Sequence, residues 1–492
     1  MTKPYMTDEG YRAYRSTLQL LTIKALKEVF PFFNINVHQS VNRATYIEIE
    51  NGKLKNEDIE KIRSLMKKYI DDDIFLPLKN VKKEEAKKIL SKKPCSLHGD
   101  KVHFTPRAEI AIYEDENCAQ AVYDKILESA GKVCEFDINL FEKGLLLRYP
   151  HPNYNGHFPP YVMGKKIIKT IEEYRDWNDM IGITNVYELN AEIEKGKVKE
   201  IINIAEIMHE KNISKIADEI KNDIKNKKVI LVSGPSSSGK TTFSNRLMLN
   251  LKVNGIKPEI ISLDDYFIDA HLSPLDEDGK PNFEDIDSLD VKKFVKDINA
   301  LVKGEEIDVP AFDFKTGKSI PNVRKMRLLG ESVVIVEGIH ALNEKLCEGV
   351  SKKNLYKVYC SALTSLCFDN GNPISPTDTR LLRRIIRDNN FRSCPADRTL
   401  EMWKSVTRGE VKNIFPYENN IDVIFNSSTV YEFSVYRKIC EPLLLEAVEK
   451  TGGSRLTERL LDLLSYFQPL DDKYIPPMSI MREFIGGSSI SY

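Results

Sequence analysis

Hydrophobic residues near the start of the chain follow both helical and strand-like spacing. Residues 8–29, preceded by the expected N-cap Thr7, carry apolar side chains three or four positions apart, which predicts an amphipathic helix. Residues 58–70 and 84–90 repeat this spacing, whereas TYIEIE at 45–50 alternates as a half-buried strand does. The pattern therefore predicts a mixed α and β domain.

A stretch rich in proline and glycine, YPHPNYNGHFPPYVMG, follows at 149–164. Such a composition is typical of a connection between domains. Residues 165–226 then return to helical spacing. We therefore expect an α+β domain at 1–150 and a helical connector at 151–226.

The pattern changes at residue 227, where short apolar runs begin. Five runs have the length of buried strands and are separated by helical patterns and loops, which favours a parallel sheet with helices on both faces. The runs lie at 229–233, 259–263, 333–337, 356–360 and 422–426. We expect this α/β domain to span 227–450, with a C-terminal helical and loop extension at 451–492.

The composition of the chain excludes several classes of function. The chain has 492 residues, with 72 Lys plus Arg against 73 Asp plus Glu and a formal net charge of −1. A chain so close to neutral does not bind nucleic acid through bulk electrostatics. No apolar run approaches the roughly 20 residues that span a bilayer, and the first residues lack the apolar core of a signal peptide. We expect neither nucleic acid nor membrane as a partner.

The eight cysteines are scattered and form no CxxC pair. The sequence therefore predicts neither a disulfide framework nor a zinc knuckle. Cysteines inside apolar stretches, such as Cys360, are interpreted as small buried thiols. This cysteine usage favours a cytoplasmic location.

The motif with the clearest chemistry is GPSSSGKT, which follows the first apolar run and precedes a helical pattern. It has the GxxxxGK[ST] form of a phosphate-binding loop, in which backbone N–H groups and a helix N-terminus face phosphate oxygens. Lys240 is expected to reach the β and γ phosphates, and the Thr241 hydroxyl is expected to bind Mg²⁺. The expected phosphate-binding residues are Gly234, Pro235, Ser236, Ser237, Ser238, Gly239, Lys240, Thr241 and Thr242.

Two further runs lead into acidic residues. SLDDYF places Asp264 and Asp265 after the second run, at the carboxyl edge where open α/β sheets bind ligands. A carboxylate there can accept the proton of an attacking hydroxyl, and Asp264 is favoured over Asp265 because it continues the strand more directly. Glu337 ends the third run. Thr241, Glu337 and Asp264 are therefore the expected metal ligands.

Downstream, TDTRLLRRIIRD places Arg380, Arg384 and Arg387 on one face of a predicted helix. Guanidinium groups suit phosphate oxygens, so these arginines are expected to neutralise the charge that develops during phosphoryl transfer. The alternative is a solvated basic helix face. Its place downstream of a phosphate-binding loop favours the functional interpretation.

Residues 229–450 resemble a uridine kinase of the uridine kinase/phosphoribulokinase group. The resemblance rests on GPSSSGKT, SLDDYF, NFEDIDSLD at 282–290, VPAFDF at 309–314, VVIVEGIHAL at 333–342 and DTRLLRRIIRD at 378–388. It implies a P-loop NTPase fold and ATP- and Mg²⁺-dependent phosphorylation of a nucleoside 5′-hydroxyl. It also implies catalytic roles for Asp264, Lys240, Arg384 and Arg387, and substrate binding by Phe267, Glu284, Phe312 and Arg380.

The sequence departs from uridine–cytidine kinases at positions that hold the ribose and the base. Glu284 stands where those kinases have an aspartate, Phe267 replaces a tyrosine and Gly317 replaces a histidine. The departures concern the acceptor rather than the phosphoryl donor. Uridine and cytidine remain the expected acceptors.

Residues 1–150 resemble the second additional domain of threonyl-tRNA synthetases, which hydrolyses mischarged tRNA. The likeness lies in STLQLLTIKALKEVFP, KNEDIEKIRSLMKKYI, VKKEEAKKIL and CEFDINLFEKGLLLRYP. The HxxxH pair of those domains would fall near Ser16 and Leu20, so no editing activity is predicted. The resemblance implies a degenerate editing-like domain ahead of the kinase.

The leading hypothesis is a nucleoside kinase that uses ATP and Mg²⁺ and takes a small molecule as its partner. One alternative keeps the kinase but changes the acceptor to a sugar phosphate or another alcohol, as in phosphoribulokinase. A second alternative is an RNA-linked regulatory NTPase. ATP and GTP both remain open as donors, and a homo-oligomer is compatible with the sequence.

Overall fold

The computed structural model describes residues 3–41, 44–93, 95, 99–160, 164–275, 279–418 and 420–490. The chain folds into two compact units, and each unit takes in separate stretches of sequence. The first contains residues 1–198, 363–379 and 429–471, and the second contains residues 199–362, 380–428 and 472–492. The domain boundaries predicted after residues 150, 226 and 450 do not coincide with this division.

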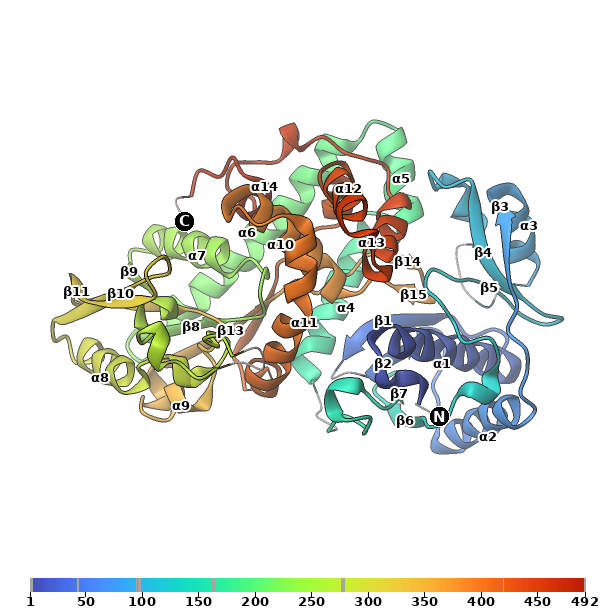
Figure 1. The fold of residues 1–492 in the computed structure, drawn as a ribbon, viewed down its shortest axis with the longest axis horizontal. Helices are drawn as coiled ribbons and strands as arrows, with labels where there is room; N and C mark the ends of the chain where they lie inside the picture. Colours follow the sequence, from blue (N-terminus) through green and yellow to red (C-terminus); the bar gives the residue numbers. More distant parts are fainter. Residues whose placement is uncertain are drawn as a thin grey trace. The chain divides into compact units, whose positions relative to one another are not determined.

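The first unit contains two antiparallel sheets (Figure 1). The larger has the strand order β1-β2-β7-β6, and the smaller has the order β3-β4-β5. The strands are β1 Ile35–Val41, β2 Ala44–Ile49, β3 Leu78–Lys82, β4 Glu109–Glu114, β5 Ala119–Ala121, β6 Asp137–Phe141 and β7 Gly144–Arg148. The predicted strand at 45–50 is confirmed as β2.

Helix α1 begins where the sequence predicts it. The Thr7 hydroxyl accepts a hydrogen bond from the backbone N–H of Gly10 and so caps the helix. Leu21 of α1 and Ile47 of β2 belong to one buried core. The helices of the first unit are α1 Asp8–Val29, α2 Asn56–Asp71, α3 Lys83–Lys92, α4 Lys165–Met180, α5 Val186–Glu194, α12 Glu432–Thr451 and α13 Arg455–Ser465. The first three confirm the helices predicted near the start of the chain.

A short hairpin joins the first unit although it lies late in the sequence. It pairs β14 (Cys367–Asp369) with β15 (Asn372–Pro373). The carbonyl of Asn370, in its turn, accepts a hydrogen bond of 2.7 Å from the backbone N–H of Val37 in β1. The hairpin therefore extends the packing of the N-terminal sheet.

The second unit contains a sheet of the order β16-β13-β8-β12-β9, in which every neighbouring pair is parallel. Its strands are β8 Val229–Ser233, β9 Lys257–Ser262, β12 Ser332–Glu337, β13 Leu355–Ser361 and β16 Val423–Asn426. All five predicted apolar runs are therefore strands of one sheet. Parallel strands need crossover connections, which helices supply here.

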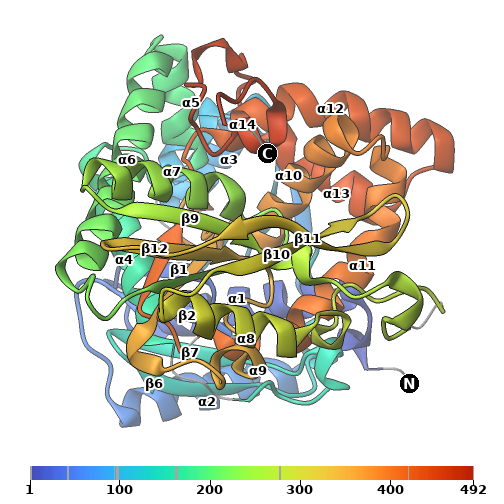
Figure 2. The ribbon, with the colours of Figure 1, turned by 90° about the vertical axis from the view of Figure 1, so that its left-hand side faces the viewer.

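Helices cover both faces of this sheet (Figure 2). On one face, the rings of His209 in α6 and Phe243 in α7 lie 5.5 and 4.5 Å from the ring of Phe425 in β16. On the other face, Phe294 of α8 shares a core with Leu231 of β8. The predicted α/β architecture is confirmed. The helices and the additional hairpin of this unit are α6 Val198–Asn222, α7 Lys240–Val253, α8 Val291–Val302, α9 Glu344–Cys347, α10 Pro376–Phe391, α11 Ala396–Asn413, α14 Arg482–Ile485, β10 Ile307–Asp313 and β11 Lys318–Met326.

The cysteines behave partly as expected. Cys347, Cys360 and Cys440 are buried free thiols. Cys95 and Cys118, however, form a disulfide in the first unit, contrary to the expectation from the cysteine spacing. Their separation of 23 residues belongs to no motif that would have revealed the pair.

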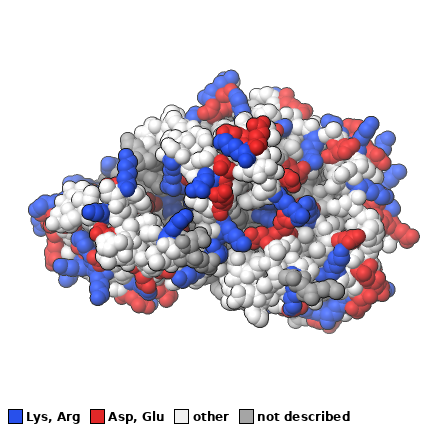
Figure 3. Space-filling model, viewed as in Figure 1, with Lys and Arg blue, Asp and Glu red and all other residues white. Residues whose placement is uncertain are grey.

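Charged side chains of both signs are interspersed over the face of the molecule in Figure 3. This distribution agrees with the balance of 72 basic against 73 acidic residues. Among the described residues, no helix combines the length and the apolar character that crossing a membrane requires.

A buried ion cluster in the first unit holds the first turn of α10, whose residues up to Thr379 belong to this unit and whose later residues belong to the second. Asp378, in the first turn of that helix, lies 3.1 Å from Arg12 of α1 and 2.8 Å from Arg459 of α13. Burial alone would raise the pKa of Asp378, but the two guanidinium charges outweigh it and hold the pKa well below its usual value of 3.8. One carboxylate thus joins three helices of different sequence origin.

We expect Asp378→Asn to lower the free energy of unfolding of the first unit by about 3–5 kcal/mol at pH 7, because two buried guanidinium groups lose their counter-charge. A depressed pKa stabilises the fold above the unfolded pKa of 3.8, so the difference should shrink as the pH falls below about 4. Urea unfolding in a Trp403→Phe background measures it, since Trp177 then reports on the first unit. Glu128→Gln, which breaks an exposed ion pair with Lys132, is the control and should leave the free energy of unfolding nearly unchanged.

Candidate functional site

The strand register of the parallel sheet brings three predicted site segments to one edge. Glu337, the last residue of β12, pairs in register with Val232 of β8 and Ser262 of β9. The phosphate-binding loop follows β8 directly, and Asp264 lies in the short turn that follows β9. The loop, Asp264 and Glu337 therefore leave the carboxyl ends of three adjacent strands, as the sequence predicts.

The backbone of the phosphate-binding loop accepts only certain residues. A Cβ on Gly234 would lie 1.8 Å from the carbonyl oxygen of Cys360, and Gly239 has a φ of +85°. Ser237 also has a positive φ of +59°, and within the described residues its buried hydroxyl has no hydrogen-bond partner. A tight loop that turns into α7 with an unpaired hydroxyl fits a phosphate group.

Lys240 closes the loop upon itself. Its ammonium group donates to the carbonyl oxygens of Gly234 at 2.9 Å and Pro235 at 3.1 Å. The neighbouring Thr241 side chain hydrogen-bonds to Glu337, which lowers the pKa of that carboxyl slightly. The two residues expected to contact phosphate and metal thus lie beside the sheet edge that carries the acids.

Three carboxyl groups lie close enough to Lys240 for its charge to affect their pKa values. Desolvation raises the pKa of Asp264, and it raises the pKa values of Glu284 and Glu337 to about 7. The positive charge of Lys240 opposes the rise at each of the three. Asp264 keeps contact with solvent, so for this group the surrounding protein removes only part of the hydration. The arrangement concentrates acid groups of high pKa around one cation.

The two adjacent aspartates have different surroundings. Asp264 experiences the charges of Lys240 and Arg392, whereas Asp265 experiences that of Arg324 in β11. Desolvation raises the pKa of both groups. Of these two aspartates, Asp264 is therefore the one that senses the Lys240 charge.

Arg384 and Arg387 of α10 also reach this region. Arg384 donates to the Ser236 hydroxyl at 2.8 Å and pairs with the buried Asp388 at 3.2 Å. Arg387 pairs with the same carboxylate at 2.9 Å. Asp388 therefore holds both arginines, and Arg384 is the one that contacts the loop.

Arg380 has surroundings different from those the sequence suggested. Instead of lying free for a substrate, its guanidinium forms a buried bidentate pair with Glu410 of α11 and donates to the Ser236 carbonyl at 3.2 Å. Glu410 also accepts the backbone N–H of Ser236 at 3.1 Å. Both side chains are under 5% exposed. Arg380 thus holds the backbone of the loop at Ser236.

A C-terminal residue without any sequence signal also contacts the loop region. The Glu483 carboxylate accepts the backbone N–H of Thr242 at 3.0 Å and its hydroxyl at 2.7 Å. Thr242 lies in the first turn of α7, where backbone donors have no partner within the helix. Glu483 therefore occupies one of the donors that the motif offers to phosphate.

Aromatic rings gather beside Glu284. Phe267 and Phe312, both expected from the sequence, have ring centroids 5.5 Å apart, and Phe283 lies 5.1 and 5.6 Å from them. Phe314 completes the cluster 5.0 Å from Phe312 and is 61% exposed. These rings offer apolar faces, and Phe314, although it ends the VPAFDF motif, was not among the expected substrate-binding residues.

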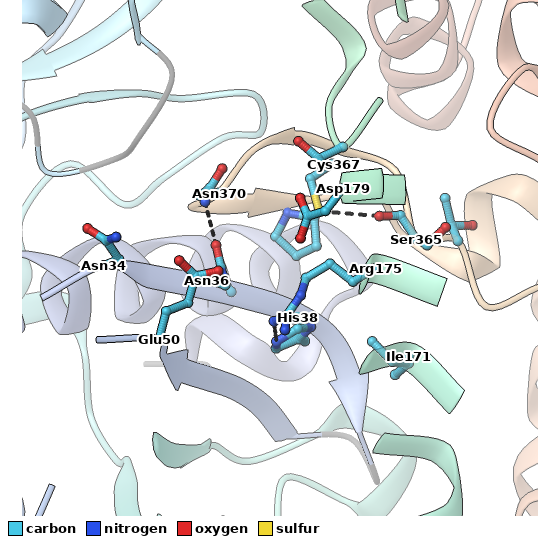
Figure 4. Close-up of a pocket in the computed structure, with 14 residues that line it drawn as sticks. Asn34, Asn36, His38, Glu50, Ile171, Arg175, Asp179, Ser365, Cys367 and Asn370 are labelled. Atoms are coloured by element: carbon cyan, nitrogen blue, oxygen red, sulfur yellow. Dashed lines mark hydrogen bonds between the residues drawn. The ribbon is translucent and has the colours of Figure 1, made fainter. Parts of the chain in front are cut away.

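The first unit holds a separate polar cavity of about 370 Å³, which contains no residue of the predicted site (Figure 4). Arg175 of α4 and His38 of β1 both contact the buried Glu48, with His38 at 2.8 Å. The pKa of Glu48 falls to about 2 because these partners outweigh its desolvation. The remaining lining includes Asn36, Glu50, Asp179 and Cys367. Its amides, acids and guanidinium suit a small polar molecule.

Among the described residues, no group of three or more His, Cys, Asp or Glu side chains forms a metal site. The expected magnesium ligands are one hydroxyl, Thr241, and two carboxyls, Asp264 and Glu337. Oxygen ligands of this kind suit Mg²⁺, which keeps several waters and binds phosphates besides one or two carboxylates. The residues present fit that ion.

We expect Glu284→Gln to stabilise the second unit at high pH. The Glu284 pKa rises from 4.5 to about 7 on folding, so its contribution to stability is present below pH 4.5 and lost as the pH rises to about 7. The variant should match the wild type near pH 4 and exceed it by about 1–3 kcal/mol at pH 8. Urea unfolding without nucleotide or metal measures this difference in the free energy of unfolding. A Trp177→Phe background leaves Trp403 as the fluorescent reporter. A difference that does not vary with pH would contradict the expectation, and exposed Glu348→Gln is the control.

Part of the second half of the chain is similar to known proteins. Residues 229–434 match the sequence profile of the Phosphoribulokinase / Uridine kinase family. Uridine-cytidine kinase A of Dictyostelium discoideum is 27% identical over 205 residues, which cover 42% of this chain and 37% of that protein. A uridine kinase of Chloroflexus aurantiacus is 27% identical over 198 residues, and one of Staphylococcus aureus is 26% identical over 180 residues; the matches cover 40% and 37% of this chain and 85% and 77% of those proteins.

Among solved structures, one described as a possible uridine kinase from Bacillus stearothermophilus aligns with 43% of this chain and 97% of its own, at 17% identity and a TM-score of 0.26. The fold assignment here rests on the parallel strand order and the loop between β8 and α7. Over residues 229–434, this chain is thus similar to the P-loop kinases of the phosphoribulokinase/uridine kinase family.

Proposed function

We propose that the protein transfers a phosphoryl group from ATP to the 5′-hydroxyl of a nucleoside, with uridine and cytidine as the first acceptors. The observation that carries this proposal is the shared effect of Lys240 on Asp264, Glu284 and Glu337 at the end of the sheet. A phosphate-binding cation surrounded by carboxyls of raised pKa suits the deprotonation of an alcohol beside a phosphate.

Asp264 is the proposed general base. Its carboxyl keeps contact with solvent and lies after β9, on the same edge as the loop. Its raised pKa makes it a better proton acceptor than an ordinary aspartate. In this role it takes the proton of the acceptor hydroxyl as that oxygen attacks phosphorus.

The phosphate-binding loop and its neighbours are the proposed donor site. The Lys240 ammonium and backbone N–H groups of the loop, at Gly239 and the start of α7, would hold the phosphates, and Thr241, Glu337 and Asp264 would hold Mg²⁺. When bound, ATP supplies the phosphoryl group and Mg²⁺ offsets the negative charge of the phosphates. Lys240 must exchange its carbonyl partners for phosphate oxygens.

Arg384 and Arg387 are proposed to neutralise charge on the transferring group. Their guanidinium groups are held on α10 by Asp388, and one of them already touches the loop at Ser236. Because the geometry is fixed before reaction, little reorganisation is needed. Arg380 acts through Ser236 and is a positioning residue.

The aromatic cluster favours a planar acceptor over a sugar phosphate. The faces of Phe312 and the exposed Phe314 can stack against a heterocyclic base, and Glu284 can accept hydrogen bonds from ribose hydroxyls. A second phosphate on the acceptor would meet this acid-rich region unfavourably. An acceptor of the phosphoribulokinase type is therefore the alternative.

We expect Asp264→Asn to lower kcat for nucleoside phosphorylation by about 10²–10⁴-fold, because the general base is lost. Its unfolding midpoint and ADP affinity should change little. Asp265→Asn is the matched control and should keep activity within about tenfold, since Asp265 faces Arg324. A coupled assay of ADP release with and without nucleoside measures both variants.

The acceptor is tested by direct product analysis with uridine, cytidine, purine nucleosides and ribulose 5-phosphate. We expect nucleoside 5′-monophosphate from a pyrimidine nucleoside. Product from ribulose 5-phosphate alone would favour the alternative, and no product from any alcohol would remove the proposal.

A further inference from the structure

The C-terminal segment of the second unit places an anion on the phosphate-binding helix. Glu483 accepts two hydrogen bonds from Thr242, one from the backbone N–H and one from the hydroxyl. Its charge also contributes to the raised pKa of Glu337. A carboxylate therefore stands at a backbone donor in the first turn of α7, where a nucleotide phosphate would bind.

The backbone that carries Glu483 is firmly packed. Ile480, Met481 and Phe484 are completely buried. The Ser479 hydroxyl donates to Glu206 of α6 at 2.6 Å, and the Phe484 carbonyl accepts from Asn390 of α10 at 3.1 Å. The Glu483 side chain is thus presented from a fixed segment, and rotation about its own bonds is the simplest way for it to leave Thr242.

Two anions cannot share this donor. A phosphate that accepts the Thr242 N–H must displace the carboxylate, because both need the same hydrogen and two adjacent anions repel each other. Glu483 stabilises the empty helix end in the way an acidic cap does. The same contact opposes the binding of a nucleotide.

We propose that Glu483 is an internal competitor for the nucleotide phosphate site, which leaves Thr242 when nucleotide binds and thereby sets the affinity for nucleotide. The inference rests on the proposed function only in that a nucleotide occupies the loop. It gives the C-terminal segment a role in the affinity of the site, which the comparisons do not cover because the family match ends at residue 434.

The test compares Glu483→Gln and Glu483→Ala with the wild-type chain. Both variants should bind Mg²⁺–ADP about tenfold more tightly in calorimetric titration, since a charge-assisted competing bond is removed. Glutamine keeps an acceptor without the charge, so its effect should be equal to or smaller than that of alanine. Exposed Glu348→Gln has the same change in charge and should leave the affinity for Mg²⁺–ADP unchanged.

A second readout without ligand separates competition from damage. Because Glu483 caps α7, both variants should unfold at a slightly lower temperature than the wild type when empty, yet gain more from Mg²⁺–ADP. Unchanged or weaker binding in the variants would overturn the inference, and so would absence of binding in all proteins. Tighter ADP binding without phosphorylation of any alcohol would uphold the inference and remove the proposed function.

Discussion

A buried ion pair holds the phosphate-binding loop in shape. Arg380 and Glu410 are removed from water, and together they satisfy both backbone polar groups of Ser236. Burying two charges carries a desolvation penalty, which is offset only when geometry and additional hydrogen bonds are good. Here the additional bonds go to the loop itself. The position of the loop is therefore tied to helices α10 and α11 as well as to strand β8.

Removal from water also explains why the site is rich in groups with raised pKa values. Asp264, Glu284 and Glu337 are partly dehydrated in one place, with Lys240 as a shared counter-charge. Such an arrangement lowers the stability of the empty fold near neutral pH. A protein retains that kind of cluster when the groups serve a charged ligand or a proton transfer.

Local patterns in the sequence were sufficient for the parallel sheet and the loop. Each strand is a short apolar run, and the loop motif lies between one strand and one helix, so spacing alone predicts that Lys240 and Asp264 follow β8 and β9. The roles of Arg380 and Glu483 could not be predicted, because their partners lie far away in the chain. Arg380 meets a residue 30 positions away, and Glu483 meets one 241 positions away. No periodic pattern encodes such pairs.

The first unit, too, could be predicted only in part from local patterns in the sequence. Its helices were predictable from their apolar faces, and its mixed α and β character is confirmed. That the β14–β15 hairpin joins this unit could not be predicted, because its strands span only three and two residues. The likeness to a synthetase editing domain stays a prediction from the sequence.

The interleaved path of the chain has a practical consequence for dividing the protein. A fragment cut at the ends of the family match, residues 229–434, would keep the hairpin and the start of α12 without the unit they pack in. It would also lose the buried side chains of Ile480, Met481 and Phe484. The apolar surfaces left uncovered would favour aggregation. The stretch that matches the family thus depends on residues outside the match to bury its apolar side chains, and we expect its solubility to depend on them too.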